Sequence, residues 1–416
     1  MRHPKPRMCR PSPPGADTRA AGTARRSWWP SAALVGVLLS GAASGALPAQ
    51  ATTGAPPAIV ASHRVPAQLA DTTFWRLVTE LSEPAGWFRS ENYVSNETAW
   101  QHVIAPVRRV VPSGHAYLGV GPEQNFTYLA AFEPSIAFIV DIRRQNLALH
   151  LFYKALFELA DTRADFLALL FSRARPAVLD TASRADLLLD AYGAMSVDSV
   201  RARATIAAVL QQLRGTHGFA LADEDAQLIE RVAWAFADAG TTINYSYIPE
   251  YGTVSFVPRG MPTFSTLLRQ DDGLGVNRSF LGSEKAYRRV RAMQQRNLVV
   301  PVTGDFAGPH ALRAVGAWLR AHDATVGTFY LSNVEQYLFQ DNATWPRFYT
   351  NVGTLPLDTT STFIRSVSNR WGRGWTSGGT PGPLMSQLIG PMEETLAAFR
   401  AGRVLWYGDV IALERK

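Results

Sequence analysis

Glycine and acidic residues follow two apolar runs in this sequence, in an order that suits a small ligand. The first run, residues 115–119, leads into Gly119 and Gly121, whose missing side chains would let the backbone approach a ligand closely. The second run, residues 136–141, ends at Asp141, 22 positions after Gly119. A carboxylate at a spacing of roughly 20 residues is typical of the acid that accepts hydrogen bonds from a ribose. The pattern therefore predicts a nucleoside site.

Polar residues also follow two later apolar runs, residues 297–303 and 325–331. The first of these runs is followed by Asp305. The second is followed by Ser332, Asn333 and Glu335. Because ligands of parallel sheets bind at the carboxyl ends of the strands, we expect all four strand ends to meet at one site.

Each of these residues also has a purely structural interpretation. Asp141 could pair with Arg143 or cap the next helix, and Asp305 could belong to a turn. Ser332 and Asn333 could cap the helix that follows them. The spacing alone leaves both interpretations open.

Strands alternate with helices along most of the chain, which predicts an α/β fold with a Rossmann-like, mostly parallel sheet. The unbroken apolarity of residues 136–141 is typical of a strand buried on both faces. The apolar spacing predicts helices over residues 68–82, 98–110, 126–132, 146–160, 309–322 and 384–400, and further strands over 363–367 and 404–413. Asp71 is expected to cap the first helix. Residues 163–239 predict a helical insertion between the second and third strands.

Two segments lack a clear period. Residues 86–97, before the first strand, mix polar and aromatic side chains. Glu91 and Glu97 in this segment could bind a ligand or order the loop, and we favour the structural role. Residues 241–259 are rich in Tyr and Val and predict a strand with a loop.

The positive charge of the chain is concentrated at its N-terminus. The 416 residues carry a net charge of +7, and residues 1–51 hold seven basic side chains and one acidic side chain, so +6 lies in this segment. An apolar stretch over residues 32–47 then leads to the small residues Ala49 and Ala51. This pattern predicts a signal peptide that is cleaved after Ala51. We therefore expect an exported protein, in the periplasm or cell envelope.

The rest of the chain then divides into a flexible linker, residues 52–67, and a single α/β domain, residues 68–416. The apolar part of the leader has 16 residues, fewer than the roughly 20 of a membrane helix, so we expect no membrane span in the mature chain. An uncleaved anchor is the less favoured alternative, and a later translation start would leave the protein in the cytoplasm. The lone cysteine, Cys9, leaves with the leader, which excludes a disulfide framework.

Several other functions lack their motifs. The eight histidines are scattered without a close ligand pair, so we expect no metal site. Residues 374–378 do not form a nucleophile elbow, because Ser377 is one place late. The charge of +1 left after residue 51 is too small for a basic field, so we expect a small-molecule ligand and no nucleic acid. The oligomeric state is left open.

Dinucleotide cofactors fit the glycine loop less well. The NAD fingerprint has a third glycine three residues after the second, where this chain has Gln124. The charge of Glu123 would also lie near the pyrophosphate. Arg143 and Arg144 could hold the 2′-phosphate of NADP, which makes an NADP-linked oxidoreductase a weaker alternative.

The same residues resemble motifs of class I S-adenosylmethionine-dependent methyltransferases, over roughly residues 110–160 and 296–340. The matching segments are Leu118–Gly121, Ile139–Asp141, Thr303–Asp305 and Tyr330–Leu338, in the order of that family. Residues 90–97 and 406–413 look like those of an uncharacterised bacterial family with such a core. The resemblance implies a methyltransferase-like fold that binds S-adenosylmethionine and transfers its methyl group to an unknown acceptor.

The resemblance also implies roles for single residues. The implied cofactor-binding residues are Gly119, Gly121, Asp141, Asp305 and Ser332. Asn333 and Glu335 would lie beside the reacting centre as the implied catalytic residues, with Glu335 as the candidate base.

A non-catalytic alternative comes from the glycine loop and from the predicted location. That family usually has an acid where this chain has Tyr117 and a glycine where it has Glu123. Pro122 removes a backbone N–H that the loop usually offers. S-adenosylmethionine is made in the cytoplasm, so an exported enzyme would lack its donor. The alternative is a non-enzymatic exported envelope protein that keeps the core as a scaffold.

Overall fold

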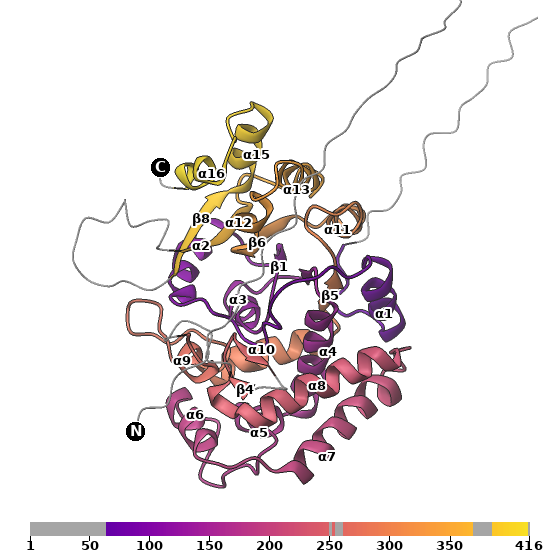
Figure 1. Ribbon diagram of the computed structural model, residues 1–416, viewed down its shortest axis with the longest axis vertical. Helices are drawn as coiled ribbons and strands as arrows, with labels where there is room; N and C mark the ends of the chain where they lie inside the picture. The colour runs from indigo at the N-terminus through magenta and orange to yellow at the C-terminus, as the bar shows by residue number, and fades with distance from the viewer. Residues whose placement is uncertain (1–63, 249–251, 254–260, 369–384, 415–416) are drawn as a thin grey trace, which may run out of the picture. The chain divides into compact units, whose positions relative to one another are not determined.

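A six-stranded sheet forms the centre of the part of the chain that the structure describes. This computed structural model describes residues 64–248, 252–253, 261–368 and 385–414, all within the compact unit Val60–Lys416. The other unit, Met1–Ile59, holds the predicted signal peptide and lies outside the described residues, as does most of the predicted linker. The strand order across the sheet is β5-β2-β1-β6-β7-β8 (Figure 1).

The strands of this sheet are short and mostly parallel. They are β1 Ala116–Gly119, β2 Ala137–Asp141, β5 Val299–Thr303, β6 Val326–Ser332, β7 Thr362–Ser368 and β8 Met385–Pro391. Every neighbouring pair is parallel except β7 and β8. Leu118 in β1 lies in register with Phe138 in β2 and Phe329 in β6. The predicted α/β fold with a mostly parallel sheet is confirmed, and it is compatible with a Rossmann-like fold.

Helices connect the strands and lie on both sides of the sheet. Those outside the insertion are α1 Asp71–Glu80, the 3-10 helix η1 Trp100–Val103, α2 Ile104–Val110, α3 Gln124–Phe132, α4 Arg144–Leu159, α10 Glu284–Gln295, α11 Ala311–Ala321, α12 Val334–Leu338, α13 Thr344–Val352, α15 Met392–Arg400 and α16 Tyr407–Leu413. In Figure 1, α3, α4 and α10 lie on one side of the sheet and α11, α13 and α15 on the other. All residues of β1, β2 and β5 are consequently buried, which explains why their sequences are apolar without alternation.

A mainly helical insertion separates β2 from β5, the second and third parallel strands, as predicted. It contains α5 Arg163–Leu170, α6 Ala185–Gly193, α7 Ser199–Leu210, the π-helix η2 Gln211–Thr216, α8 Asp223–Ala239, the 3-10 helix η3 Gly240–Thr242, a ribbon of β3 Tyr247–Ile248 and β4 Gly252–Thr253, and α9 Phe264–Leu268. Helix α8 packs against α4, so the insertion adds a layer beneath the sheet.

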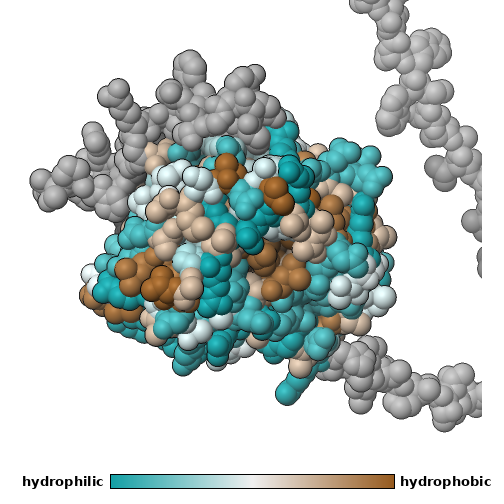
Figure 2. Space-filling model, turned by 90° about the horizontal axis from the view of Figure 1, so that it is seen from below, coloured by the Kyte–Doolittle hydropathy of each residue, from teal (hydrophilic) through white to brown (hydrophobic). Residues whose placement is uncertain are grey.

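The face seen in Figure 2, from below the view of Figure 1, is mainly hydrophilic with separate apolar patches. Among the described residues of the insertion, the exposed apolar side chains include Val178, Leu187, Val197 and Val200. The longest helix described, α8, has 17 residues. Among the described residues, no helix has the length and apolarity needed to cross a membrane.

The segment predicted as one helix over residues 384–400 divides into a strand and a helix. Strand β8 pairs in antiparallel register with the whole of β7, which satisfies the backbone groups of that stretch. Pro391 ends the strand and, with φ −62°, serves as the residue before α15. Glu393 and Glu394 lie in the first turn of α15, where the helix dipole favours acids.

The predicted closing strand over residues 404–413 is wrong, because Tyr407–Leu413 form helix α16. The helix starts there because Asp409 Oδ2 accepts hydrogen bonds from the backbone N–H groups of Leu405 and Trp406, at 2.8 and 3.2 Å. The start of this helix depends on the Asp409 side chain, which the spacing of apolar residues does not indicate.

The predicted capping role of Asp71 is also wrong. Asp71 is the first residue of α1, and Ala70 stands at the cap position without a side-chain hydrogen bond. The Asp71 carboxylate instead accepts hydrogen bonds from Asn297 Nδ2 and from His217 Nδ1, each at 2.8 Å. It therefore joins α1 to the start of β5 and to the insertion.

Candidate functional site

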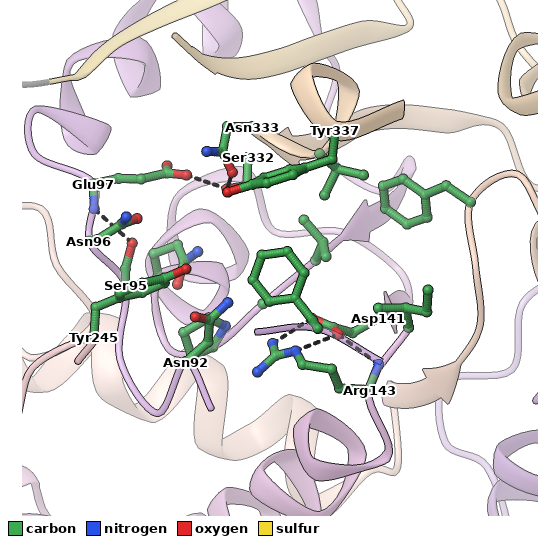
Figure 3. A pocket seen from close by; sticks show the side chains of 18 of the residues that line it. Asn92, Ser95, Asn96, Glu97, Asp141, Arg143, Tyr245, Ser332, Asn333 and Tyr337 are labelled. Carbon is green, nitrogen blue, oxygen red and sulfur yellow. Dashed lines mark hydrogen bonds and ion pairs between the residues drawn. The ribbon is translucent and has the colours of Figure 1, made fainter. Parts of the chain in front are cut away.

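A cavity of about 250 Å³ opens at the carboxyl ends of β1, β2, β5 and β6 (Figure 3). The chain passes from β1 to β2 and β5 on one side and then to β6 on the other, so the cavity lies at the topological switch point of the sheet. Its wall includes five of the predicted site residues: Gly121, Asp141, Asp305, Ser332 and Asn333. Gly119 and Glu335 are not in this wall.

The glycine loop is filled from behind by Asn125. Gly121 has φ +77°, in the left-handed region that glycine adopts without a steric penalty, and it faces the cavity. At Gly119, a Cβ would overlap the Asn125 side chain. Asn125 is buried, and its Nδ2 donates to the carbonyls of residues 120–122 at 3.0, 3.1 and 2.8 Å. Gly119 is therefore required for packing, whereas Gly121 is placed to meet a ligand.

Asp141 reaches the cavity wall and also forms a buried ion pair with Arg143. Arg143 donates to Asp141 Oδ1 from Nε and from its backbone N–H, both at 3.0 Å, and to Oδ2 from Nη2 at 2.8 Å. A carboxylate offers about four acceptor positions, so one position on Oδ2 stays available to a ligand. The pairing with Arg143 is confirmed, and a ribose would find a single acceptor there rather than two.

Arg143 also anchors the segment that covers the cavity, residues 86–97, hereafter the covering segment. Its Nη1 donates to the carbonyl oxygens of Glu91 at 2.5 Å and Ser90 at 3.5 Å. Two aromatic residues of the covering segment, Trp87 and Phe88, line the cavity. The end of β2 thus positions both the candidate ribose acid and part of the cavity's cover.

Asp305 lies in the cavity wall and in a turn after β5, so its turn interpretation is confirmed, and its role toward a ligand stays a prediction. Its carboxylate accepts a hydrogen bond from the backbone N–H of Ala307 at 2.9 Å. Its own backbone N–H donates to Glu83 Oε1 at 2.7 Å. The turn fixes the position of Asp305 at the edge of the site.

Ser332 and Asn333 end β6 at the cavity, close to Glu97 (Figure 3). Ser332 has φ +52°, and its hydroxyl donates to Glu97 Oε1. Asn333 occupies the cap position of α12, but no side-chain cap hydrogen bond is formed there. The capping interpretation of this pair is therefore wrong.

Glu335 belongs to a buried ion cluster outside the cavity wall. Its Oε2 accepts a hydrogen bond from Arg365 Nε at 2.5 Å, and its Oε1 accepts one from Tyr349 at 2.6 Å. Arg365 is fully buried and also pairs with Glu414 after α16. The cluster joins α12, β7 and the C-terminal helix, so these contacts give Glu335 a structural role.

Glu97 lies in the cavity wall, whereas a structural role within its loop was favoured from the sequence. It lines the cavity with 1 % exposure, and its Oε2 accepts hydrogen bonds from Tyr330 at 2.6 Å, from Gln387 at 3.3 Å and from Ser366. Burial raises the pKa of Glu97, against the lowering effect of these bonds and of the Ser332 hydroxyl. Its partners lie 233 to 290 positions later, so no local spacing could have indicated them.

A second buried acid, Glu123, stands behind the glycine loop. Its carboxylate accepts hydrogen bonds from the backbone N–H of Ser95 at 3.2 and 3.3 Å. Burial raises the pKa of Glu123 to about 8, and the nearby Glu97 adds to this rise. Glu123 therefore holds the covering segment against the glycine loop.

Aromatic rings form much of the remaining wall. Among them are Trp87, Phe88, Tyr245 and Tyr337. Phe88 and Tyr337 meet edge to face with ring centroids 5.2 Å apart. These rings come from the covering segment, the insertion and α12, so their meeting could not be read from one stretch of sequence.

The charges of the wall restrict what the cavity can bind. Its described charged residues are Glu97, Asp141, Asp305 and Arg143. Since Arg143 is already paired with Asp141, a bound phosphate would meet acids without a free cation. In the described ranges no group of three potential metal ligands comes together.

Comparison with known proteins identifies the family. No curated protein matches this chain. A family model described as "Domain of unknown function (DUF7790)" matches residues 93–192 and 262–400, which is more than half of the chain. These ranges contain all six strands of the sheet and both Glu97 and Asp141. The chain therefore belongs to the DUF7790 family.

Proposed function

We propose that this protein binds S-adenosylmethionine or a closely related nucleoside in the cavity and acts as a methyltransferase on a small-molecule acceptor. The observation that carries the proposal is the placement of Gly121 and Asp141 in the wall of one cavity, at the switch point of the sheet. This placement accords with the resemblance of Leu118–Gly121 and Ile139–Asp141 to methyltransferase motifs.

The chemistry of the wall fits this ligand. S-adenosylmethionine carries a positive sulfonium and no phosphate, and the cavity wall has three acids against one paired arginine. Two acceptor atoms of the wall, Asn92 Oδ1 and Gln124 Oε1, lack hydrogen-bond partners in the described structure. A ligand rich in N–H and O–H donors would satisfy them.

In this proposal S-adenosylmethionine supplies an electrophilic methyl group. The free acceptor position of Asp141 holds one ribose hydroxyl, and Gly121 lets the ligand lie against the backbone. Asn333 lines the wall near Glu97, where an acceptor would be held. Phe88 and Tyr245, which are half-buried in the wall, exclude water. Positioning then supplies much of the rate, since effective molarities of well-oriented reactants reach about 10⁵ M or more.

Calorimetric titration of the protein with S-adenosylmethionine tests the proposal. We expect binding at one site, weakened about tenfold in Asp141→Asn by loss of a charged hydrogen bond. Asp225→Asn is a matched control, because Asp225 is also buried and paired with an arginine, Arg144, but does not line the cavity. Absence of binding at millimolar ligand would contradict the proposal.

The scaffold alternative has one specific observation in its favour. Asn125 fills the space behind the glycine loop, as expected if the loop were kept for packing alone. A cavity without affinity for any nucleoside would support this alternative.

The NADP alternative is disfavoured by the partners of its two arginines. Arg143 is paired with Asp141, and Arg144 donates to both carboxylate oxygens of Asp225 at 2.8 and 2.7 Å. A 2′-phosphate would have to break one of these pairs. Fluorescence titration with NADPH distinguishes this alternative, and we expect no binding.

A further inference from the structure

One end of the cavity holds a carboxyl group, that of Glu97, with no cation beside it among the described residues. The described groups that form hydrogen bonds to the Glu97 carboxyl are the hydroxyls of Tyr330, Ser332 and Ser366 and the amide of Gln387. A carboxyl that is 1 % exposed is costly to ionise without a cation. Its Oε1 accepts from Ser332 alone among these groups, so an acceptor position is left for a ligand.

A second, independent acceptor lies in the same wall. Gln124 is 2 % exposed and lines the cavity, and its Oε1 has no hydrogen-bond partner in the described structure. The direction of this amide is set by Tyr330, whose hydroxyl donates to Glu97 at 2.6 Å and accepts from Gln124 Nε2 at 2.9 Å. Tyr330 therefore links the two acceptors into one polar network.

Asn92 adds a third acceptor to this wall. Its Oδ1 is also buried without a described partner. Glu97, Gln124 and Asn92 thus each place an acceptor atom in the wall of the cavity. A ligand group that complements Glu97 and Gln124, which Tyr330 links, carries several N–H donors, and an ammonium group has three on one atom.

We propose that the Glu97 end of the cavity binds an ammonium group, and that the methyl acceptor is therefore an amine. The assignment of this amine as the acceptor rests on the proposed function, whereas its binding at Glu97 does not. Aromatic rings of the same wall, including Tyr245 and Tyr337, would add cation–π attraction for the bound group.

The position of Glu97 separates this site from the nucleoside site. Figure 3 shows Glu97 beside Ser332 and Asn333 on one side of the cavity and Asp141 on the other. A donor held at Asp141 would thus face an amine held at Glu97. The ammonium must first lose a proton, which Glu97 is placed to accept. The lone pair of the nitrogen then forms a bond to the methyl carbon as the bond between that carbon and the sulfonium sulfur breaks, and the donor leaves as a neutral thioether.

The first experiment compares two probes on the unmodified protein by ligand-observed NMR. The probes are 2-phenylethylammonium and its neutral isostere 2-phenylethanol. We expect the amine to bind about tenfold more tightly or better, because one hydrogen bond to a charged group separates the two. Equal affinity for both probes would overturn the proposal, and this comparison needs no variant that must fold.

The second experiment locates the site with Glu97→Gln. This variant should lose the preference for the amine, whereas Glu91→Gln, in the same covering segment but not in the cavity wall, should keep it. Loss in both variants, or in neither, would overturn the assignment to Glu97.

A parallel titration with S-adenosylmethionine separates the two proposals. If the donor fails to bind but the amine binds through Glu97, the proposed function fails and the ammonium site stands. If Glu97→Gln weakens the donor as much as the amine, the ammonium at Glu97 belongs to the donor, and the assignment of an amine acceptor is overturned.

Discussion

At the scale of single residues, the buried acids decide how this site responds to pH. Glu97 and Glu123 are buried without ion-pair partners among the described residues, whereas the Asp141 carboxylate is compensated by Arg143. A group whose pKa is raised by folding binds its proton more tightly in the folded state. The folded protein is therefore stabilised at low pH by such acids and loses this stabilisation as pH rises.

Glu123 gives a defined pH window for this effect. Burial raises its pKa from 4.5 to about 8, so the stabilisation is fully present below pH 4.5 and is lost as pH rises through 8. Relative to Glu123→Gln, the natural protein should lose up to about 1.4 kcal/mol of unfolding free energy per pH unit within this window. Urea unfolding at several pH values measures the difference.

An exposed glutamate on α1 provides the control for that measurement. Glu80→Gln should show no such pH-dependent difference from the natural protein, because Glu80 is exposed. A constant difference between Glu123→Gln and the natural protein across the window would contradict the prediction.

Asn125, the second residue of α3, should contribute strongly to stability because its side chain binds the glycine loop. Asn125→Ala removes the donor to three loop carbonyls and the acceptor of the Tyr117 hydroxyl, which lies 2.8 Å from Oδ1. We expect a loss of about 3 kcal/mol in unfolding free energy, measured by urea denaturation. Tyr117→Phe removes one of these bonds and should cost about 1 kcal/mol. Equal losses in the two variants would show that the loop carbonyls do not depend on Asn125.

The ion pair of Asp141 could be predicted because it is local, although the equally local capping roles of Asp71 and Asn333 were wrong. Asp141 follows directly from the end of an apolar strand, and its partner Arg143 is two positions away. Glu97 could not be assigned in this way, because its partners come from β6, β7 and β8 and meet it through the tertiary fold. The position of Glu335 could not be predicted for the same reason. Arg365 and Glu414, which are distant in the sequence, hold it in a buried cluster.

At the scale of elements, Arg365 holds the C-terminal part of the chain to the sheet. It extends from β7 to Glu335 at α12 and to Glu414 after α16, and all three side chains are at most 1 % exposed. The apolar spacing of residues 404–413 could not predict the ion pair of Arg365 with Glu414, because its partners are distant in the sequence. The apolar runs of β1, β2 and β5 were predictable because burial on both faces leaves a local trace.

Removing Arg365 should therefore loosen the C-terminal elements. Arg365→Met leaves Glu335 and Glu414 buried without their cation, and we expect a loss of about 3–5 kcal/mol in unfolding free energy. Arg365→Lys keeps the charge but not the planar fork and should lose less. Hydrogen exchange should report the earliest loss of protection in α16.

The control for this prediction is an exposed arginine on α13. Arg347→Met should leave the unfolding free energy and the protection of α16 unchanged, since Arg347 is exposed. If Arg365→Met unfolds like the control, the buried cluster does not hold α16.

At the scale of the whole molecule, the sheet and its switch point were predictable, whereas the cover of the cavity was not. The strand ends meet because parallel strands point the same way, and that rule needs only the strand positions. Tyr245 reaches the cavity from the end of the insertion, and Trp87 reaches it from the covering segment. Both lie outside the family match, 93–192 and 262–400, so the matched core and these parts of the cavity's cover are separate features of the chain.

The partition of charge along the chain gives the last prediction, which concerns location. Residues 1–51 carry +6 of the net charge of +7. Their basic part comes first, and the segment ends in a small-residue cleavage pattern at Ala49 and Ala51. We expect cell fractionation and N-terminal sequencing to find an exported chain that begins at Thr52. Ala51→Trp should block cleavage, because the site requires a small residue, whereas Ala55→Trp should not. A full-length chain in the cytoplasm would contradict this prediction. It would also place the cavity where S-adenosylmethionine is made, whereas an exported chain that binds the nucleoside must meet it outside the cytoplasm.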